Sequence, residues 1–325
     1  MRALYLVFSH DHQKQLYRLV SAMRLLSPKG LIVIHHDPSN GPLDASVYIN
    51  MKDVYLIPTP VCGDWGGFSL VEQYLHSFKW CKENLNFDWI ITLTGLTYPI
   101  MPLTNFENHL ESSDYDAFIY NFNAFDVEHW PKGTATKRYL FYYIKLPRNH
   151  YYYKLPTIIK SALNKTRIKL NKIQPFLRIA PMPRGVPTRL GIRRWRFPFN
   201  KDFTIYGGRQ MVTINNSALN EIFSFIKNNK GFINYSKHTL IPDESFFVSI
   251  ICNSKKLKIC NNLLRYIKWP KGISHPSSGD VILKDDIDDA IDSGEPFALK
   301  FDSRIDATTL DLLDTHLGIS SDQHS

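Results

Sequence analysis

The sequence has no long hydrophobic run, few cysteines and no internal repeat. No apolar stretch approaches the roughly 20 residues of a membrane-spanning helix, and the apolar start at residues 3–8 is too short for the hydrophobic core of a signal peptide. The four cysteines show no C-x-x-C spacing and are too few for a disulfide scaffold. These absences favour a cytoplasmic protein.

Acidic residues are missing from one long segment of the chain. Between His129 and Lys201 the sequence holds 18 lysines or arginines and no aspartate or glutamate. The rest of the chain contains the other 21 basic residues and all 30 acidic ones, so it is net acidic although the whole protein carries a charge of +9. The segment is also rich in tyrosine. A basic, aromatic surface of this kind must face an anionic or lipid-like partner.

The sequence does contain the alternating strand and helix patterns that are typical of a large α/β protein. Its 325 residues are 44% hydrophobic, enough to bury a large core. Short apolar runs alternate with amphipathic stretches, which predicts βαβ units, a parallel sheet and ligands at the carboxyl ends of strands. Strands are expected at 4–8, 31–37, 54–57, 89–93 and 116–120, and helices at 13–26, 69–83, 157–170, 217–227, 244–252 and 285–293.

The organisation along the chain follows from the same patterns. We predict one domain over residues 1–315, with a nucleotide-binding half at about 1–130 and an acceptor and catalytic half at about 201–315. Between them the proline-rich basic segment, about 131–200, lacks clean periodicity and is interpreted as an insertion. Residues 316–325 are predicted to be a disordered tail.

An acid pair, Asp243-Glu244, follows Pro242 at the head of an apolar run that continues to Ile251. A carboxylate at such a boundary is partly desolvated, which makes it a better proton acceptor. The same position suits acidic residues that cap a helix N-terminus. The residues alone leave both interpretations open.

Other motifs are weaker. Trp65-Gly66-Gly67 opens a helix and allows close backbone approach to an anion, whereas Asp114-Tyr115-Asp116 precedes its strand and is more typical of a solvated turn than of a metal site. The histidines at 10, 12, 35 and 36 lack metal-ligand spacing and are expected to be satisfied polar residues near a cleft. Lys300, held between apolar flanks, is expected to pair with a carboxylate or a phosphate.

These motifs, in this order, resemble the core-2/I-branching family (glycosyltransferase family 14), which holds β-1,6-N-acetylglucosaminyltransferases, peptide O-xylosyltransferases and bacterial relatives. The resemblance runs from Tyr5 to about Leu313. The motifs that carry it are Ile34-His35-His36-Asp37, Trp65-Gly66-Gly67-Phe68-Ser69, Leu93-Thr94-Gly95-Leu96-Thr97-Tyr98-Pro99, Tyr206-Gly207-Gly208-Arg209-Gln210, Pro242-Asp243-Glu244-Ser245-Phe246-Phe247, Arg265-Tyr266-Ile267-Lys268-Trp269, His275-Pro276 and Phe297-Ala298-Leu299-Lys300-Phe301-Asp302.

The resemblance implies an α/β, GT-A-like, Rossmann-type nucleotide-sugar-binding sheet and inverting transfer from a UDP-sugar, with no cofactor and no metal. It assigns Glu244 as the general base and Lys300 as the cation that stabilises the departing UDP. The residues that it places at the donor are Val7, Asp37, Trp65, Gly66, Gly67, Thr94, Gly95, Arg209 and Lys300. On the acceptor side it places Trp269, Asp243 and Arg265.

Two departures from the family pattern concern the donor. Thr97 stands where many relatives have an aspartate, so one donor contact is expected to be lost or replaced. The stretch Ser277–Asp280 carries no cation, although some relatives have an arginine there that clamps a phosphate. We hypothesise that Arg209, Lys268 or Lys271 supplies the missing charge.

The expected partners are a UDP-sugar and a glycan or lipid-linked glycan acceptor. The donor sugar is expected to be N-acetylglucosamine, with xylose as the alternative, and a catalytically inactive glycan-binding or membrane-surface scaffold is the non-enzyme alternative. The animal members have an N-terminal membrane anchor that is not seen here, which favours a bacterial-type enzyme at the inner face of the cell membrane. Residues 131–200 are expected to face an anionic membrane surface, with an acidic polysaccharide and a merely solvated face as alternatives; the segment has no nucleic-acid-reading motif.

Overall fold

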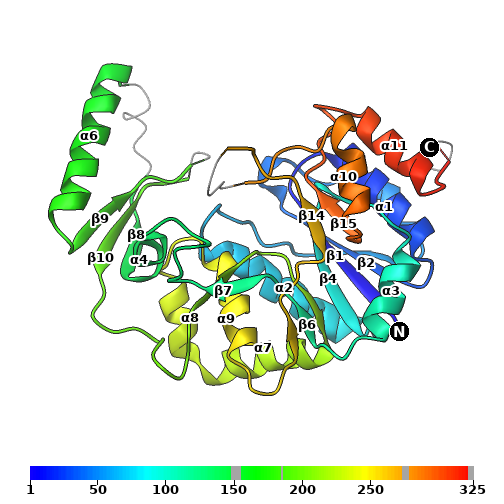
Figure 1. The fold of residues 1–325 in the computed structure, drawn as a ribbon, viewed down its shortest axis with the longest axis horizontal. Helices are drawn as coiled ribbons and strands as arrows, with labels where there is room; N and C mark the ends of the chain where they lie inside the picture. The colour runs from blue at the N-terminus through cyan, green and yellow to red at the C-terminus, as the bar shows by residue number, and fades with distance from the viewer. Residues whose placement is uncertain (148–154, 184–185, 273–277, 321–325) are drawn as a thin grey trace.

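The structure, a computed structural model, describes residues 1–147, 155–183, 186–272 and 278–320. Its centre is a seven-stranded sheet in the order β13-β6-β12-β4-β1-β2-β3, seen in Figure 1. The strands are β1 (Ala3–Ser9), β2 (Leu31–His36), β3 (Val54–Leu56), β4 (Trp89–Thr94), β6 (Ala117–Phe118), β12 (Thr213–Asn215) and β13 (Ile259–Cys260). β1, β2, β3 and β4 run parallel, and β12 is antiparallel to both β4 and β6.

Both faces of this sheet are buried, because side chains of β1 alternate between two apolar clusters. Tyr5 and Val7 belong to one cluster, and Leu4 and Leu6 to the other. The first face is covered by α1 (Gln13–Leu26), α3 (Leu103–Glu111), α10 (Ile287–Asp292) and α11 (Thr308–His316). The second is covered by α2 (Phe68–Asn84), α7 (Asn216–Asn228), α8 (Lys230–Ser236) and α9 (Phe246–Cys252).

Two smaller sheets lie beside the central one and carry the remaining motifs. β14 (Arg265–Ile267), β15 (Phe297–Leu299) and β5 (Thr97–Pro99) form a three-stranded sheet with β15 in the middle. β11 (Tyr206–Gly208) pairs antiparallel with β7 (Asn121–Asn123). Segments far apart in the sequence therefore meet through these short strands.

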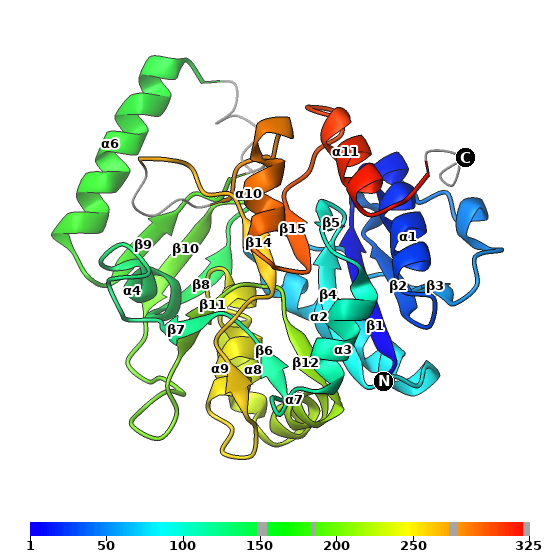
Figure 2. The same cartoon turned by 45° about the vertical axis from the view of Figure 1, so that its right-hand side comes forward.

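The basic segment folds into an arm at one end of the molecule. It contains α4 (Thr134–Tyr139), β8 (Phe141–Lys145), α6 (Thr157–Ile173), β9 (Leu177–Ala180) and β10 (Arg189–Arg193), with the strands in the antiparallel order β8-β10-β9. Figures 1 and 2 show α6 standing at the edge of this arm, away from the central sheet. The sequence predicted the helix, extended here to Ile173, but not the sheet.

The predicted α/β class is confirmed, with a mixed, largely parallel sheet covered by helices on both faces. The helix predicted from Glu244 starts at Phe246, after a short 3-10 turn over Pro242–Glu244. The predicted start of a disordered tail at residue 316 is too early, because His316 ends α11 and Ile319 is buried. Residues 321–325 of that tail, and the His275-Pro276 motif, lie outside the described residues. No helix in the described ranges is long and apolar enough to cross a membrane.

Candidate active site

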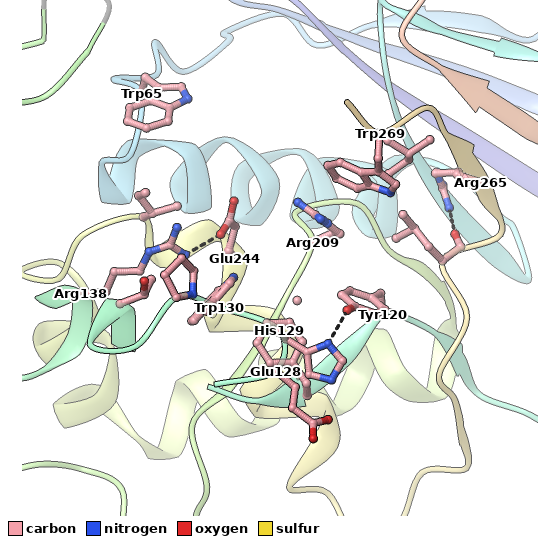
Figure 3. Close-up of a pocket in the computed structure, with 17 residues that line it drawn as sticks. Trp65, Tyr120, Glu128, His129, Trp130, Arg138, Arg209, Glu244, Arg265 and Trp269 are labelled. Atoms are coloured by element: carbon pink, nitrogen blue, oxygen red, sulfur yellow. Dashed lines mark hydrogen bonds and ion pairs between the residues drawn. The ribbon is translucent and has the colours of Figure 1, made fainter. Parts of the chain in front are cut away.

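A cavity of about 670 Å³ lies where the loop before α2, the turn before α9 and the start of the basic segment meet. Figure 3 shows the aromatic and charged side chains around it. They are Trp65, Tyr120, Glu128, His129, Trp130, Arg138, Arg209, Glu244, Arg265 and Trp269. Five of the residues that the sequence analysis selected, Trp65, Arg209, Glu244, Arg265 and Trp269, therefore line one cavity.

Glu244 is positioned by the apolar helix that follows it. Phe246 and Phe247 in the first turn of α9 are fully buried, and they pack against Phe68 and Tyr74 of α2. This packing fixes the start of the helix on the protein core. The Pro242–Glu244 turn then holds Glu244 at the cavity wall, where its side chain remains 22% exposed.

The Trp65-Gly66-Gly67 loop contacts the Glu244 turn directly. The backbone N–H of Ile241, next to Pro242, donates to the carbonyl oxygen of Gly66 at 3.0 Å. Gly66 has a φ of +67°, a left-handed conformation that favours glycine. Gly67 precedes the first residue of α2 in extended geometry. Two motifs that are 175 residues apart in sequence thus form one wall of the cavity.

Arg138 forms an ion pair with Glu244 that the sequence analysis did not predict. Its Nη1 donates to Glu244 Oε2 at 2.5 Å, and its guanidinium lies over the ring of Trp130, 4.3 Å from the ring centre. Burial works to lower the pKa of Arg138, but Glu244 and Tyr139 together outweigh it, so the pKa is raised. Arg138 therefore stays charged beside Glu244. Nothing in the sequence distinguishes Arg138 from the other basic residues of its segment.

Asp243 is buried beneath the turn and does not line the cavity. It does not cap α9: Ser245 is the N-cap residue, and Asp243 Oδ1 has no hydrogen-bond partner among the described residues. The capping interpretation of the acid pair therefore does not hold for Asp243. Burial, followed by repulsion from Glu244, raises the pKa of Asp243 to about 7.

Asp243→Asn should flatten the dependence of stability on pH. The folded protein holds the Asp243 proton up to a pKa of about 7, whereas the unfolded chain releases it near the ordinary aspartate pKa of 3.8. The stabilisation is complete below pH 3.8 and is lost as the pH rises to 7, at about 1.4 kcal/mol for each unit of pKa shift. Urea unfolding at pH 5 and pH 8 measures it: wild type should lose more stability than the variant. Equal losses would contradict a buried, protonated Asp243.

Arg209 and Trp269 lie together in the cavity wall, on the side that faces Glu244 (Figure 3). The Arg209 guanidinium lies over the Trp269 ring, 4.5 Å from its centre. Burial lowers the pKa of Arg209, which the nearby Glu244 only partly offsets. Trp269 keeps 37% of its surface exposed, so an apolar sugar face could stack on it.

Arg265 supports the cavity wall from beneath. It is 5% exposed, and its Nη2 donates to the carbonyl oxygen of Thr92 at 2.7 Å. Its Nη1 donates to the carbonyl oxygen of Leu263 at 2.5 Å. Burial lowers the pKa of Arg265 to about 10. The hydrogen bonds of Arg265 thus join the end of β4 to the loop before β14.

Four of the residues selected for the donor, Val7, Asp37, Thr94 and Gly95, lie in or just after β1, β2 and β4. The N–H of Asp37 donates to Ser9, and the N–H of Gly95 donates to Phe8, so the loops after β2 and β4 both meet the end of β1. Val7, also selected, is buried within β1. None of Val7, Asp37, Thr94 and Gly95 lines the cavity that contains Glu244.

The side chains of Asp37 and Thr97 are both held by hydrogen bonds within the protein. Asp37 Oδ2 accepts from the Gly63 N–H at 2.6 Å and from Gln73 at 3.0 Å, and Oδ1 accepts from Ser39. Burial opposes ionisation of Asp37, but these hydrogen bonds outweigh it and lower its pKa. Thr97 Oγ1 accepts from the backbone N–H of Thr94 at 3.2 Å. Where relatives have an aspartate, this chain thus uses a hydroxyl to brace its own loop.

Lys300 lies between the residues of the Glu244 cavity and the residues at the carboxyl ends of β1, β2 and β4. It does not line the cavity, but β15 ends one residue before it, and Leu299 packs in a cluster with Leu263 and Ile267. The next residue, Phe301, donates its N–H to Leu96 in the loop after β4. The Lys300 ammonium donates to the Ser278 hydroxyl. Through its neighbours, Lys300 is therefore connected both to residues of the Glu244 cavity and to the loop after β4.

Of the three cations hypothesised to replace the missing arginine, Lys268 is already engaged. It forms an ion pair with Asp286 at 2.6 Å. Arg209 instead lines the cavity with Glu244. Between these two cations, the geometry favours Arg209, and Lys271 stays an open alternative.

The predictions about possible metal ligands can be compared with the contacts. His35 pairs with Ser77 and His36 with Ser9, as expected for satisfied polar histidines. Asp116 accepts from Asn215 and from the backbone of Lys258, so it has a structural role. A group at the cavity rim that was not predicted from the sequence consists of Asp126, Glu128 and His129, whose ligand atoms lie within 4.8 Å of one another. Such spacing could suit a cation, but exposed acidic groups are common without one.

Comparison with known proteins shows that a model of the Core-2/I-Branching enzyme family matches residues 4–288. A search of curated proteins gave no significant match. Among solved structures, the chain is similar to the galactosyltransferase LgtC in complex with donor and acceptor sugar analogs, at 10% identity and a TM-score of 0.38, over 99% of this chain and 98% of that one.

Two further solved structures are similar at the same low level. HddC from Yersinia pseudotuberculosis, complexed with GMP-PN, shows 12% identity and a TM-score of 0.26 over 67% of this chain and 79% of that one. A nucleoside-diphosphate-sugar pyrophosphorylase from Vibrio cholerae shows 9% identity and a TM-score of 0.33 over 80% of this chain and 90% of that one. The structural similarities add nothing to the family match at these TM-scores.

Proposed function

Because this chain belongs to the core-2/I-branching enzyme family and is therefore a glycosyltransferase with a GT-A-like fold, we propose that it is an inverting, metal-independent enzyme. In this proposal it transfers a sugar, most simply N-acetylglucosamine, from a UDP-sugar to a hydroxyl group of a glycan acceptor. The observation that carries the proposal is the position of Glu244 in a cavity between two tryptophans, Trp65 and Trp269.

Glu244 has the surroundings that a general base needs. Arg138 donates to Oε2, while Oε1 has no hydrogen-bond partner among the described residues and is the oxygen that would accept a proton. In the proposed step the acceptor hydroxyl oxygen forms a bond to the anomeric carbon and its proton passes to Glu244. The bond from that carbon to the phosphate oxygen breaks on the opposite face, and UDP leaves with the electron pair. One base and one stabilised leaving group suffice.

The departing diphosphate needs positive charge beside it. We assign this role to Lys300, with Arg209 as the second cation in place of the arginine that some relatives carry. Lys300 connects to the strand-end loops through Phe301, and Arg209 faces the reaction cavity. A fixed cation aimed at developing charge stabilises a transition state more than a mobile one does, because little reorganisation is needed.

EDTA should leave UDP release unchanged, because protein cations replace the divalent metal in this proposal. The measurement is UDP release from the active donor in the presence of excess EDTA and after re-addition of Mn²⁺. A loss of activity that Mn²⁺ restores would contradict metal independence. The rim group Asp126, Glu128 and His129 would then be the first place to look for the ion.

The donor sugar and the scaffold alternative are tested by one panel. UDP release is measured from UDP-N-acetylglucosamine, UDP-xylose and other UDP-sugars. We expect the first to be the best donor, and preference for UDP-xylose would assign the enzyme to xylosyl transfer. Absence of UDP release from every donor would favour an inactive glycan-binding or membrane-surface scaffold.

For the acceptor we propose a lipid-linked glycan, with the enzyme working at the inner face of the cell membrane. Pro131, Thr134 and Arg138 of the basic segment line the reaction cavity itself. An acceptor that entered the cavity past this segment would meet a surface suited to both negative charge and lipid.

A further inference from the structure

Helix α6 exposes its apolar side chains. No residue of this 17-residue helix is buried. Four apolar side chains, at spacings of four, seven and three residues, form a stripe that is about half exposed or more: Ile159 at 44%, Leu163 at 47%, Leu170 at 47% and Ile173 at 68%. An amphipathic helix in a globular protein normally packs such a stripe on the core.

The side of α6 that meets the protein is polar instead. Asn171 exchanges two hydrogen bonds, both 3.0 Å, with the backbone of Ile179 on the edge strand β9. The only described residues of α6 that are not classed as exposed are Lys160, Arg167 and Asn171. The helix is thus docked through polar groups, which leaves its apolar stripe without a partner in the described part of the chain.

The three-stranded sheet of the arm adds a second exposed apolar area. Ile192 on β10 pairs in register with Tyr142 on β8 and with Leu177 on β9, so the three side chains share a face. All three are exposed. An apolar groove of about 370 Å³ between Tyr142, Ile192 and Trp195 is bordered by Arg193, Arg194 and Arg196. Trp195 is 77% exposed and its ring approaches Phe176.

We infer that this arm surface, defined by the α6 stripe, the Tyr142–Ile192–Leu177 face and Trp195, lies on an anionic phospholipid bilayer. The inference rests on the proposed function in one respect: membrane binding would bring the cavity to a membrane-held acceptor. Lysines and arginines surround the apolar stripe, and the whole segment from His129 to Lys201 has no acidic residue. Interfacial helices combine these two features, and exposed tryptophan is typical of the boundary between headgroups and acyl chains.

Charge and exposed apolar area together decide between the bilayer and other occupants of this surface. A second copy of this chain would bring two arms of the same sign together, which is unfavourable. A nucleic acid would satisfy the positive charge but would leave the isoleucine and leucine stripe exposed to water. An anionic bilayer satisfies both the charge and the apolar area.

The arm is also fastened to the candidate active site. Arg138 at the end of α4 holds Glu244, and Lys145 at the end of β8 holds Asp64, next to Trp65. Arg189 at the start of β10 is buried and donates to the carbonyl oxygen of Thr239 at 3.3 Å. A bilayer beneath the arm would therefore set the orientation of the cavity relative to the membrane.

Vesicle co-sedimentation of the full chain tests the inference. Wild type should bind vesicles of phosphatidylserine and phosphatidylcholine, should not bind phosphatidylcholine alone, and should dissociate in high salt. Lys165→Glu/Lys169→Glu/Lys172→Glu should weaken binding at least about a hundredfold, because each lost charge near an anionic surface costs about fivefold. Leu163→Ser/Leu170→Ser/Ile173→Ser should weaken it by removing the apolar stripe. Circular dichroism would check that both variants are folded.

A matched charge reversal away from the arm is the control. Lys14→Glu/Lys29→Glu/Lys230→Glu changes net charge equally at exposed sites and should bind nearly as wild type. Wild type that ignores anionic vesicles, arm variants that bind like the control, or a dimer lost in the leucine variant would each overturn the inference. UDP release with a soluble acceptor, measured in parallel, separates the two proposals: activity without vesicle binding leaves the enzyme intact, and vesicle binding without activity leaves the surface intact.

Discussion

Glu244→Gln lowers the rate of sugar transfer by about 10²–10⁴-fold and leaves the affinity for UDP unchanged, because glutamine keeps the shape of the side chain but cannot accept the proton. The amide oxygen can still accept from Arg138, so the cavity wall should retain its geometry. The measurements are single-turnover transfer from the preferred UDP-sugar and UDP titration by calorimetry.

The control for this variant is Glu128→Gln. Glu128 lines the same cavity but is exposed at its rim, outside the ion pair with Arg138. We expect its effect on the transfer rate to be small. Near-normal turnover of the Glu244 variant would remove the base assignment, and equal losses in both variants would indicate a general electrostatic effect rather than proton transfer.

Lys300→Ala should lower transfer by about 10²–10³-fold, because the diphosphate would lose a fixed cation as negative charge develops on it. UDP affinity should fall as well, since the same charge is present in the bound product. Arg209→Met should weaken UDP binding by a smaller amount. Lys268→Met should leave UDP binding unchanged, because Lys268 is held by Asp286.

The matched control for Lys300 is Lys284→Ala, an exposed lysine in the stretch before α10. If Lys300→Ala abolished transfer while substitutions of Arg209, Lys268 and Lys271 all left UDP affinity intact, the substitute-clamp hypothesis would fail. Wild-type activity in the Lys300 variant would contradict its assignment as the leaving-group cation.

The sequence predicted the central elements closely because their signals are local. Leu16, Leu19, Val20 and Met23 mark one helical face, and the predicted helix from Gln13 to Leu26 matches α1. The motif loops after β1, β2 and β4 could be placed together because carboxyl ends of parallel strands meet at one edge. The contact between the Trp65 and Glu244 loops, in contrast, depends on a backbone hydrogen bond between distant segments.

The contacts of Asp243 and Glu244 could not be predicted from the sequence, and the capping interpretation does not hold for Asp243. Capping is a common use of an acid before a helix, but here α9 starts at Phe246 and Asp243 is buried without capping it. Arg138 is one of 18 basic residues in its segment, and only the fold brings it to Glu244. Neither the burial of Asp243 nor the ion pair between Arg138 and Glu244 produces a periodic pattern in the sequence.

The sequence by itself determined the α/β class, the family and the reversed charge of residues 131–200, because composition, periodicity and motif order can be read directly from the chain. Its motifs also led to the proposed roles of Glu244 and Lys300. Only the tertiary structure decided which residues share a cavity and which way the α6 stripe faces. The physical reason is that an amphipathic pattern specifies two faces of a helix, but the packing partner decides which face is buried. In α6 the hydrogen bonds to β9 are polar, and the apolar stripe stays exposed.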